Sequence, residues 1–157
     1  MSYISTLQGE LEFSDTLSLL QAVQYLHKGK WANKMTIDIP DGQIIPKGEV
    51  ATINIPVRTY RNLGRNLEEI ANLADDGYVV GTSTEVNWHG FIITPKEGHV
   101  QFDLEKWITD NKDKLDADKQ RPHKEEYDTE SKWFEAYSDW QTTYEMEFRS
   151  AVTPSPA

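Results

Sequence analysis

The sequence predicts an α+β protein, built on a ferredoxin-like βαββαβ sandwich with an added β-hairpin and a C-terminal helical and aromatic extension. The first observation is that segments with period-two and helical hydrophobic spacing follow one another in that order over residues 3–86. The second is that a glycine-containing hairpin pattern and an aromatic helical pattern come after it. At 157 residues, the chain is long enough for one domain with its own core.

The first strand and helix are predicted from residues 3–29. Apolar and polar side chains alternate from Tyr3 to Phe13, which is typical of a half-buried strand. A helix capped by Ser14 or Asp15 should follow and end at Gly29. The strand would bury Tyr3, Leu7, Leu11 and Phe13, and the apolar positions of the helix are Leu17, Leu20, Val23 (or Gln24) and Leu26 (or His27).

Two more strands and a second helix follow. Alternation predicts strands at residues 35–39 and 51–57, the first of them ending at a Pro40-Asp41-Gly42 turn. Asn66 and Glu69 have capping-box spacing at the start of the helix. The expected apolar positions are Met35, Ile37 and Ile39, then Ala51, Ile53, Ile55 and Val57, then Leu67, Ile70, Ala71 and Ala74.

The remaining elements add to this unit. A strand is expected over residues 78–86, and a hairpin over residues 91–94 and 99–104 would extend or edge the sheet. A helix should start at Asp103 and run to about Asp116, before a polar surface connection through Pro122. Residues 129–140 read as a helix. Residues 142–149 also alternate, so both a helix followed by a strand and one long helix remain open.

The predicted domain organisation follows from these elements. Residues 1–104 form the core with its added hairpin, and residues 105–152 form an acidic aromatic extension packed on the same domain. Residues 153–157, with two prolines, are predicted to be a disordered tail.

The segment from Ser2 to Phe13, with its central Gly9-Glu10 and the leucine-rich helix after it, resembles small uncharacterised proteins of bacteriophages and bacteria. The stretch from Val79 to Val100 is similar to the hairpin after their second helix. The resemblance implies a small α+β protein of phage or mobile-element origin, and it carries over no catalytic residue.

Composition limits the function. A net charge of −10 argues against direct binding to nucleic acid or to an anionic membrane, and favours a protein partner with a basic surface. The absence of cysteine fits a cytoplasmic protein, and no apolar run reaches the roughly 18 residues that a membrane span needs. Residues 105–157 hold 13 acidic and 8 basic residues, the same numbers as residues 1–104 over half the length.

The acidic, aromatic C-terminal third is the main candidate site. Its rings have helical spacing, so they either pack within the domain or form a partner-binding face in which acids select a basic partner. Intramolecular packing is the commoner use of such rings. The predicted partner-binding residues are Trp133, Tyr137, Trp140, Tyr144, Glu130 and Asp139.

Two further clusters could carry chemistry. Arg58, Arg61 and Arg65 precede a helix and form a candidate anion-binding site, although solvated arginines are the commoner reading. His99 and Asp103 lie on one side of a predicted strand near His89, which could serve metal binding or proton transfer. Polar strand faces are far commoner than such sites, so neither a metal nor a cofactor is predicted.

The sequence therefore predicts a non-enzymatic protein that binds or inhibits a macromolecular partner. The first alternative is an acidic nucleic-acid mimic that blocks a basic DNA- or RNA-binding cleft. A lower alternative is a small hydrolase or a protein that binds an anionic ligand. Sheets of this kind often pair through an edge or an open face, which makes a homodimer a candidate assembly.

Overall fold

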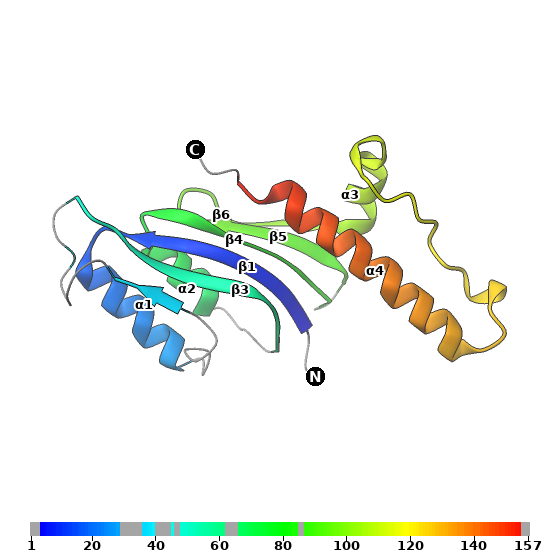
Figure 1. Cartoon of the computed structure of the whole chain (residues 1–157), viewed down its shortest axis with the longest axis horizontal. Helices are drawn as coiled ribbons and strands as arrows, with labels where there is room; N and C mark the ends of the chain where they lie inside the picture. The colour runs from blue at the N-terminus through cyan, green and yellow to red at the C-terminus, as the bar shows by residue number, and fades with distance from the viewer. Residues whose placement is uncertain are drawn as a thin grey trace.

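The computed structural model describes residues 4–28, 36–39, 45, 48–61, 66–84 and 87–154. Within them, six strands form one antiparallel sheet in the order β2-β3-β1-β4-β5-β6, accompanied by four α-helices (Figure 1). The strands are β1 (Ile4–Phe13), β2 (Thr36–Asp38), β3 (Ala51–Arg61), β4 (Asp76–Ser83), β5 (His89–Thr94) and β6 (Gly98–Asp103). The helices are α1 (Thr16–Lys28), α2 (Asn66–Leu73), α3 (Leu104–Asp110) and α4 (Glu130–Val152).

The predicted α+β class is confirmed, and the predicted hairpin extends the sheet beside β4. The finer ferredoxin-like assignment stays a prediction. Strand β4 ends at Ser83, three residues before the predicted end, and residues 85–86 lie outside the described part. The expected turn at residues 40–42 also lies outside it.

One face of the sheet packs against α1 and α2 and forms the main core. Leu7, Leu11 and Phe13 are fully buried, as the alternation in β1 predicts. In α2, the predicted stripe of Leu67, Ile70, Ala71 and Ala74 is also buried.

The predicted inner face of α1 is wrong for two leucines. Leu17 and Leu20 are 62% and 55% exposed, whereas Leu19 and Ala22 are buried together with the expected Leu26. Both sets have helical spacing, so periodicity alone does not choose between them. Packing against α2 favours the face with the small side chain of Ala22, because it allows a close approach of the two helices.

Strand β3 is shifted by one residue where Pro56 interrupts it. Leu7 pairs with Arg58 but Gly9 pairs with Ile55, so two residues of β3 face one residue of β1. Proline lacks the N–H that a sheet ladder requires and is accommodated at such bulges. The extra residue reverses the alternation, which explains why Val57, predicted to be in the core, is 55% exposed.

Helix α4 crosses the second face of the sheet. Thr82, Gly90 and Phe102 are register neighbours on β4, β5 and β6, and α4 packs across this row. The Phe148 ring contacts Gly90, where a Cβ atom would collide with it, and stands edge-on to Phe102 and Trp107 at centroid distances of 5.5 Å and 5.1 Å. Gly90 therefore lets the end of α4 approach the sheet closely.

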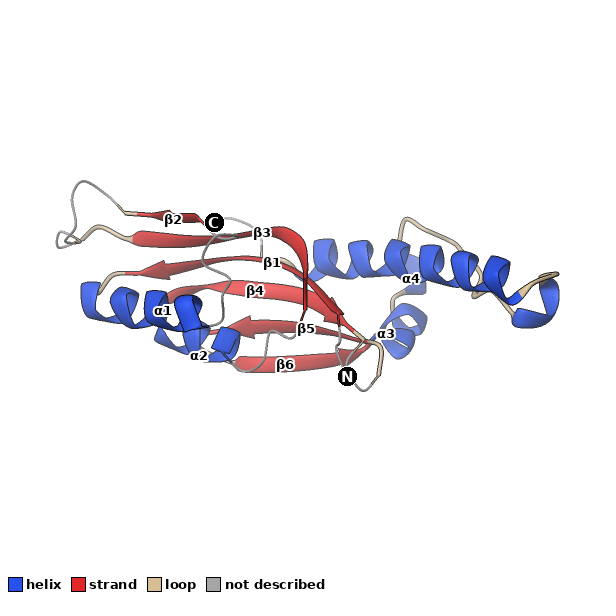
Figure 2. Ribbon diagram, turned by 90° about the horizontal axis from the view of Figure 1, so that it is seen from below, coloured by secondary structure: helices blue, strands red, loops and turns tan. Residues whose placement is uncertain are grey.

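The C-terminal third is one long helix rather than a helix followed by a strand. Thr129 caps it by accepting a hydrogen bond from the Lys132 N–H at 3.2 Å, and it continues to Val152. The predicted helix after Asp103 is shorter than expected: α3 ends at Asp110 and a 3₁₀ turn follows. Figure 2 shows the N-terminal half of α4 projecting beyond the ends of the strands.

Candidate functional site

The first candidate site is an arm, formed by residues 130–144 of α4 and the strap of residues 111–129 that returns along them (Figure 1). Four rings of α4 follow one another along the side that faces the strap. Neighbouring centroids are 5.3 Å, 5.7 Å and 5.6 Å apart along the series Trp133, Tyr137, Trp140 and Tyr144.

The strap has little regular structure, and the rings hold it by hydrogen bonds to its backbone. The indole N–H of Trp133 donates to the Pro122 carbonyl at 3.2 Å, and that of Trp140 donates to the Lys119 carbonyl at 3.4 Å. The Tyr144 hydroxyl accepts from the Lys119 N–H at 2.9 Å. Aromatic side chains with a polar end suit this position because they exclude water and still satisfy backbone groups.

Of the four predicted partner-binding rings, Trp140 and Tyr144 are buried. These two rings therefore pack within the domain, as one of the two alternatives for the ring series predicted. Trp133 and Tyr137 are half-buried. Each of these two carries a cation of the strap over its ring, Lys124 at 5.9 Å and Arg121 at 5.7 Å from the centroid. Their role in partner binding stays a prediction.

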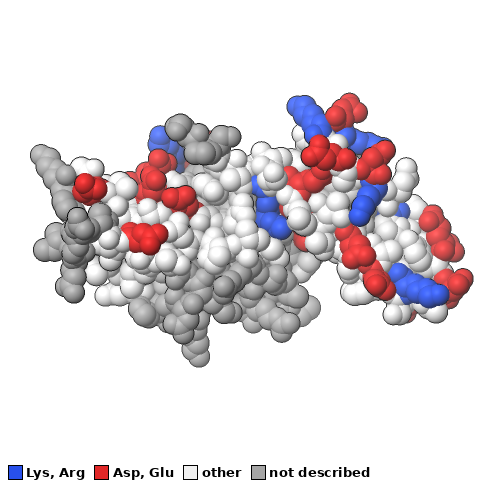
Figure 3. Space-filling view, viewed as in Figure 1, with Lys and Arg blue, Asp and Glu red and all other residues white. Residues whose placement is uncertain are grey.

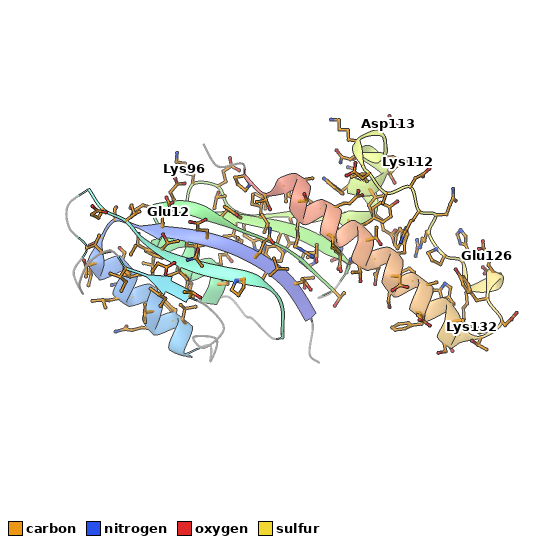
Figure 4. All side chains as sticks on the ribbon, in the orientation of Figure 1. Glu12, Lys96, Lys112, Asp113, Glu126 and Lys132 are labelled. Carbon is orange, nitrogen blue, oxygen red and sulfur yellow. The ribbon has the colours of Figure 1, made fainter. Side chains whose placement is uncertain are left out.

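The predicted acids Glu130 and Asp139 are exposed on the arm. Glu130 forms an ion pair with Lys124 at 3.6 Å. Phe134, between them, is 62% exposed and was not singled out by its spacing. Figure 3 shows acidic side chains gathered over the arm with fewer basic ones among them, and Figure 4 places Glu126 and Lys132 at its far end.

The second candidate site is the part of the sheet that α4 leaves uncovered, over β1, β2 and β3. A groove of about 340 Å³ lies there. Burial and the nearby Glu10 carboxylate raise the pKa of Tyr78, and the Asn54 amide donates to Asp38 at 2.5 Å. The groove is lined by Gln8, Gly9, Glu10, Thr36, Asn54, Ile55, Pro56, Val57 and Tyr78.

A second groove, of about 450 Å³, adjoins the first and runs beside the end of α4. Arg149 lines it and is 9% exposed, with its Nη1 donating to the Thr82 hydroxyl at 3.4 Å. Burial lowers the pKa of Arg149, and the Glu145 carboxylate partly opposes this shift. The groove is lined by Gln8, Val57, Met146, Arg149, Ser150, Thr153 and Pro154.

The predicted histidine cluster is only partly assembled. His99 and Asp103 do lie on one side of β6, and Asp103 is the register partner of His89. The ring of Phe91 lies beside both histidine rings, with centroid distances of 6.3 Å to His89 and 5.4 Å to His99. The side chain next to the two histidines is therefore apolar. Burial lowers the pKa of His99 despite Glu68, whose carboxylate is 3.9 Å away. Asp103 caps α3 instead, accepting from the Lys106 N–H.

Within the described residues, no group of three or more His, Cys, Asp or Glu side chains could hold a metal ion. The predicted anion site at Arg58, Arg61 and Arg65 lies outside the described side chains. Among the described helices, none combines the length and apolarity needed to cross a membrane.

No protein-family model, curated protein or solved structure matches the chain. Sequence reasoning missed Phe134, Val57 and Arg149. Pro56 within a strand pattern is the signal that could have indicated a bulge and an exposed Val57. Arg149 carries no such signal, because its burial follows from the way α4 crosses the sheet.

Proposed function

We propose that this protein is a non-enzymatic binding protein whose acidic arm docks onto a basic surface of a protein partner and blocks it. The observation that carries the proposal is Phe134. This large apolar side chain is 62% exposed on a projecting helix and stands among the exposed acids Glu130, Glu135 and Asp139.

The position of Phe134 on α4 supports this assignment. Phe134, Ser138, Gln141 and Glu145 recur at helical spacing, so they form one stripe along the helix. At its C-terminal end this stripe contacts the rest of the protein, because Glu145 accepts a hydrogen bond from the Trp88 indole N–H at 2.9 Å. At its N-terminal end it extends past the sheet, and Phe134 is left exposed.

Charge supports the choice of partner. Residues 110–140 contain ten acidic and six basic residues, and Glu135 and Asp139 form no ion pair with any described residue. An acidic rim around an apolar contact steers a basic partner and disfavours an acidic one. Lys124 and Arg121 of the strap lie over the Trp133 and Tyr137 rings, which supports cation–π contact as the way in which this ring series attracts basic groups.

We also infer the finer fold assignment. The first four strands are antiparallel in the order β2-β3-β1-β4, and α1 and α2 pack on the same face of the sheet. This arrangement supports a ferredoxin-like unit to which β5 and β6 are added. A cytoplasmic location remains the prediction from the cysteine-free composition.

A random peptide display library, panned against the full-length protein, tests the proposal. We expect the enriched peptides to be rich in lysine or arginine and to contain an apolar residue. Phe134→Ala should weaken the best peptide about tenfold, a loss of about 1.4 kcal/mol. The matched control is Leu17→Ala, because Leu17 has the same 62% exposure on a different helix.

Salt separates this function from nucleic-acid mimicry. Binding through Phe134 should persist at about 0.5 M salt, whereas a mimic would lose its partner steeply as surface charges are screened. Equal peptide affinity of the wild type and Phe134→Ala would contradict the proposal. If binding also disappeared at high salt, the mimic would be the better account.

A further inference from the structure

Arg149 is the one lysine or arginine that is buried among the described side chains. A guanidinium has five N–H donors and keeps its charge at any ordinary pH, so its burial is costly unless an acceptor or counter-charge compensates it. Its position in the groove beside α4 therefore calls for a partner.

The described part of the chain supplies only a weak one. Nη1 of Arg149 donates to the neutral Thr82 hydroxyl at 3.4 Å, and no described carboxylate lies within ion-pair distance. Glu145, one turn earlier on α4, is engaged by the Trp88 indole N–H. The other guanidinium nitrogens of Arg149 have no hydrogen-bond partner among the described residues, and none of them is a fully buried unpaired atom, so they reach the surface at the groove that Arg149 lines.

The rest of the groove is suited to a small organic ligand. The Ser150 hydroxyl also lines it, and the Gln8 amide donates to the Thr153 hydroxyl, which in turn donates to the Arg149 carbonyl. Met146 and Val57 supply an apolar wall that is 58% and 55% exposed. A concave site with an apolar wall and a few polar groups, one of them charged, is typical of small-molecule binding.

We propose that this groove binds an organic monoanion, with a carboxylate against Arg149 and an apolar body along Met146 and Val57. A monoanion suits the site better than a phosphate dianion, because Arg149 is the one cation among the described side chains that line it, in a chain of net charge −10. The carboxylate end lies at Arg149 and away from Glu10, which lines the adjoining groove and would repel it. This site is separate from the arm and independent of the proposed function.

Hexanoate, hexanol and hexylamine are matched probes for a titration followed by amide chemical shifts. We expect hexanoate to shift the signals of Gln8, Ser150 and Thr153, and to bind at least about tenfold more tightly than the alcohol or the amine. Inorganic phosphate should bind more weakly than hexanoate. Equal binding of hexanol would overturn the role of Arg149, and equal binding of phosphate would overturn the assignment to an organic carboxylate.

Two variants test the residue itself. Arg149→Met removes the charge and keeps much of the side-chain bulk, so hexanoate affinity should fall at least about tenfold. Met146→Glu changes an exposed side chain three residues from Arg149 on α4, where the new carboxylate can pair with the guanidinium and exclude the ligand. Arg121→Met is the control, because Arg121 is an exposed arginine of the strap.

Hexanoate binding should be lost in Met146→Glu and unchanged in Arg121→Met. If Arg149→Met fails to fold, Met146→Glu still decides the question, since its substituted side chain is exposed. Wild-type hexanoate affinity in a folded Met146→Glu protein would overturn the proposal.

Discussion

The core between the sheet and helices α1 and α2 is mainly aliphatic, whereas the interior of the arm is aromatic. In the core, strands and helices satisfy their own backbone hydrogen bonds, so the side chains between them need only be apolar. In the arm, one helix packs against a strap of largely irregular backbone. Its side chains must exclude water and also bond to that backbone. Trp and Tyr rings do both, and the Glu147 carboxylate also accepts from the Ala117 N–H at 2.9 Å.

Phe148→Ala should have the largest effect, because Phe148 joins the two regions. Its ring is fully buried against β5, β6 and α3, so its truncation should lower the free energy of unfolding by about 3–5 kcal/mol. Urea unfolding measures this change. Phe134→Ala, at an exposed site on the same helix, should stay within about 0.5 kcal/mol of the wild type. A Phe148→Ala effect below that of the control would mean that α4 and the sheet are not coupled.

Tyr144→Phe should have a smaller effect, confined to the arm. It removes a hydroxyl that accepts from the Lys119 N–H and is near the Ala117 and Lys119 carbonyls, at an expected cost of about 1–3 kcal/mol. Hydrogen exchange should become faster at the Lys119 amide and stay unchanged in β1 and β4. Equal acceleration in the sheet would show that the arm and the core unfold as one unit.

Asp75→Asn should have a modest, pH-dependent effect on the free energy of unfolding, and it acts on the sheet-and-helix region rather than on the arm. The Ser14 N–H and hydroxyl both donate to Asp75 at 2.7 Å and lower the pKa of its carboxyl group. A lowered pKa contributes stability above the unfolded value, 3.8, and this contribution is lost as pH falls through the folded value. Because the group is exposed, the difference at neutral pH should not exceed about 1 kcal/mol. A wild-type–variant difference that persists at pH 2 would contradict this origin.

Leu17→Ala should have the smallest effect, within about 0.5 kcal/mol, because the side chain is exposed. Its matched control is Leu19→Ala, two residues away on α1 and buried, which should cost about 2–5 kcal/mol. Thermal or urea unfolding of the pair tests which face of α1 packs in the core. A reversed order of the two effects would support the face predicted from sequence spacing.

Much of the core could be predicted from sequence, because strand alternation and helix caps are local. Asp15, one of the two predicted caps, accepts from the Leu17 N–H and the Ser18 hydroxyl, while Ser14 bonds to Asp75. The candidate sites were harder to predict. Spacing identified the ring series but did not separate the buried Trp140 and Tyr144 from the half-buried Trp133 and Tyr137. That distinction depends on where the strap and the sheet end relative to α4.

By itself, the sequence determined the α+β class, the alternating core strands and the acidic, aromatic character of the C-terminal third, since these follow from composition and local periodicity. Only the tertiary structure decided the inner face of α1 and the burial of Arg149. Each depends on contacts between segments far apart in the chain. A helix with apolar residues on more than one side has no inner face until a neighbouring surface excludes water from one of them.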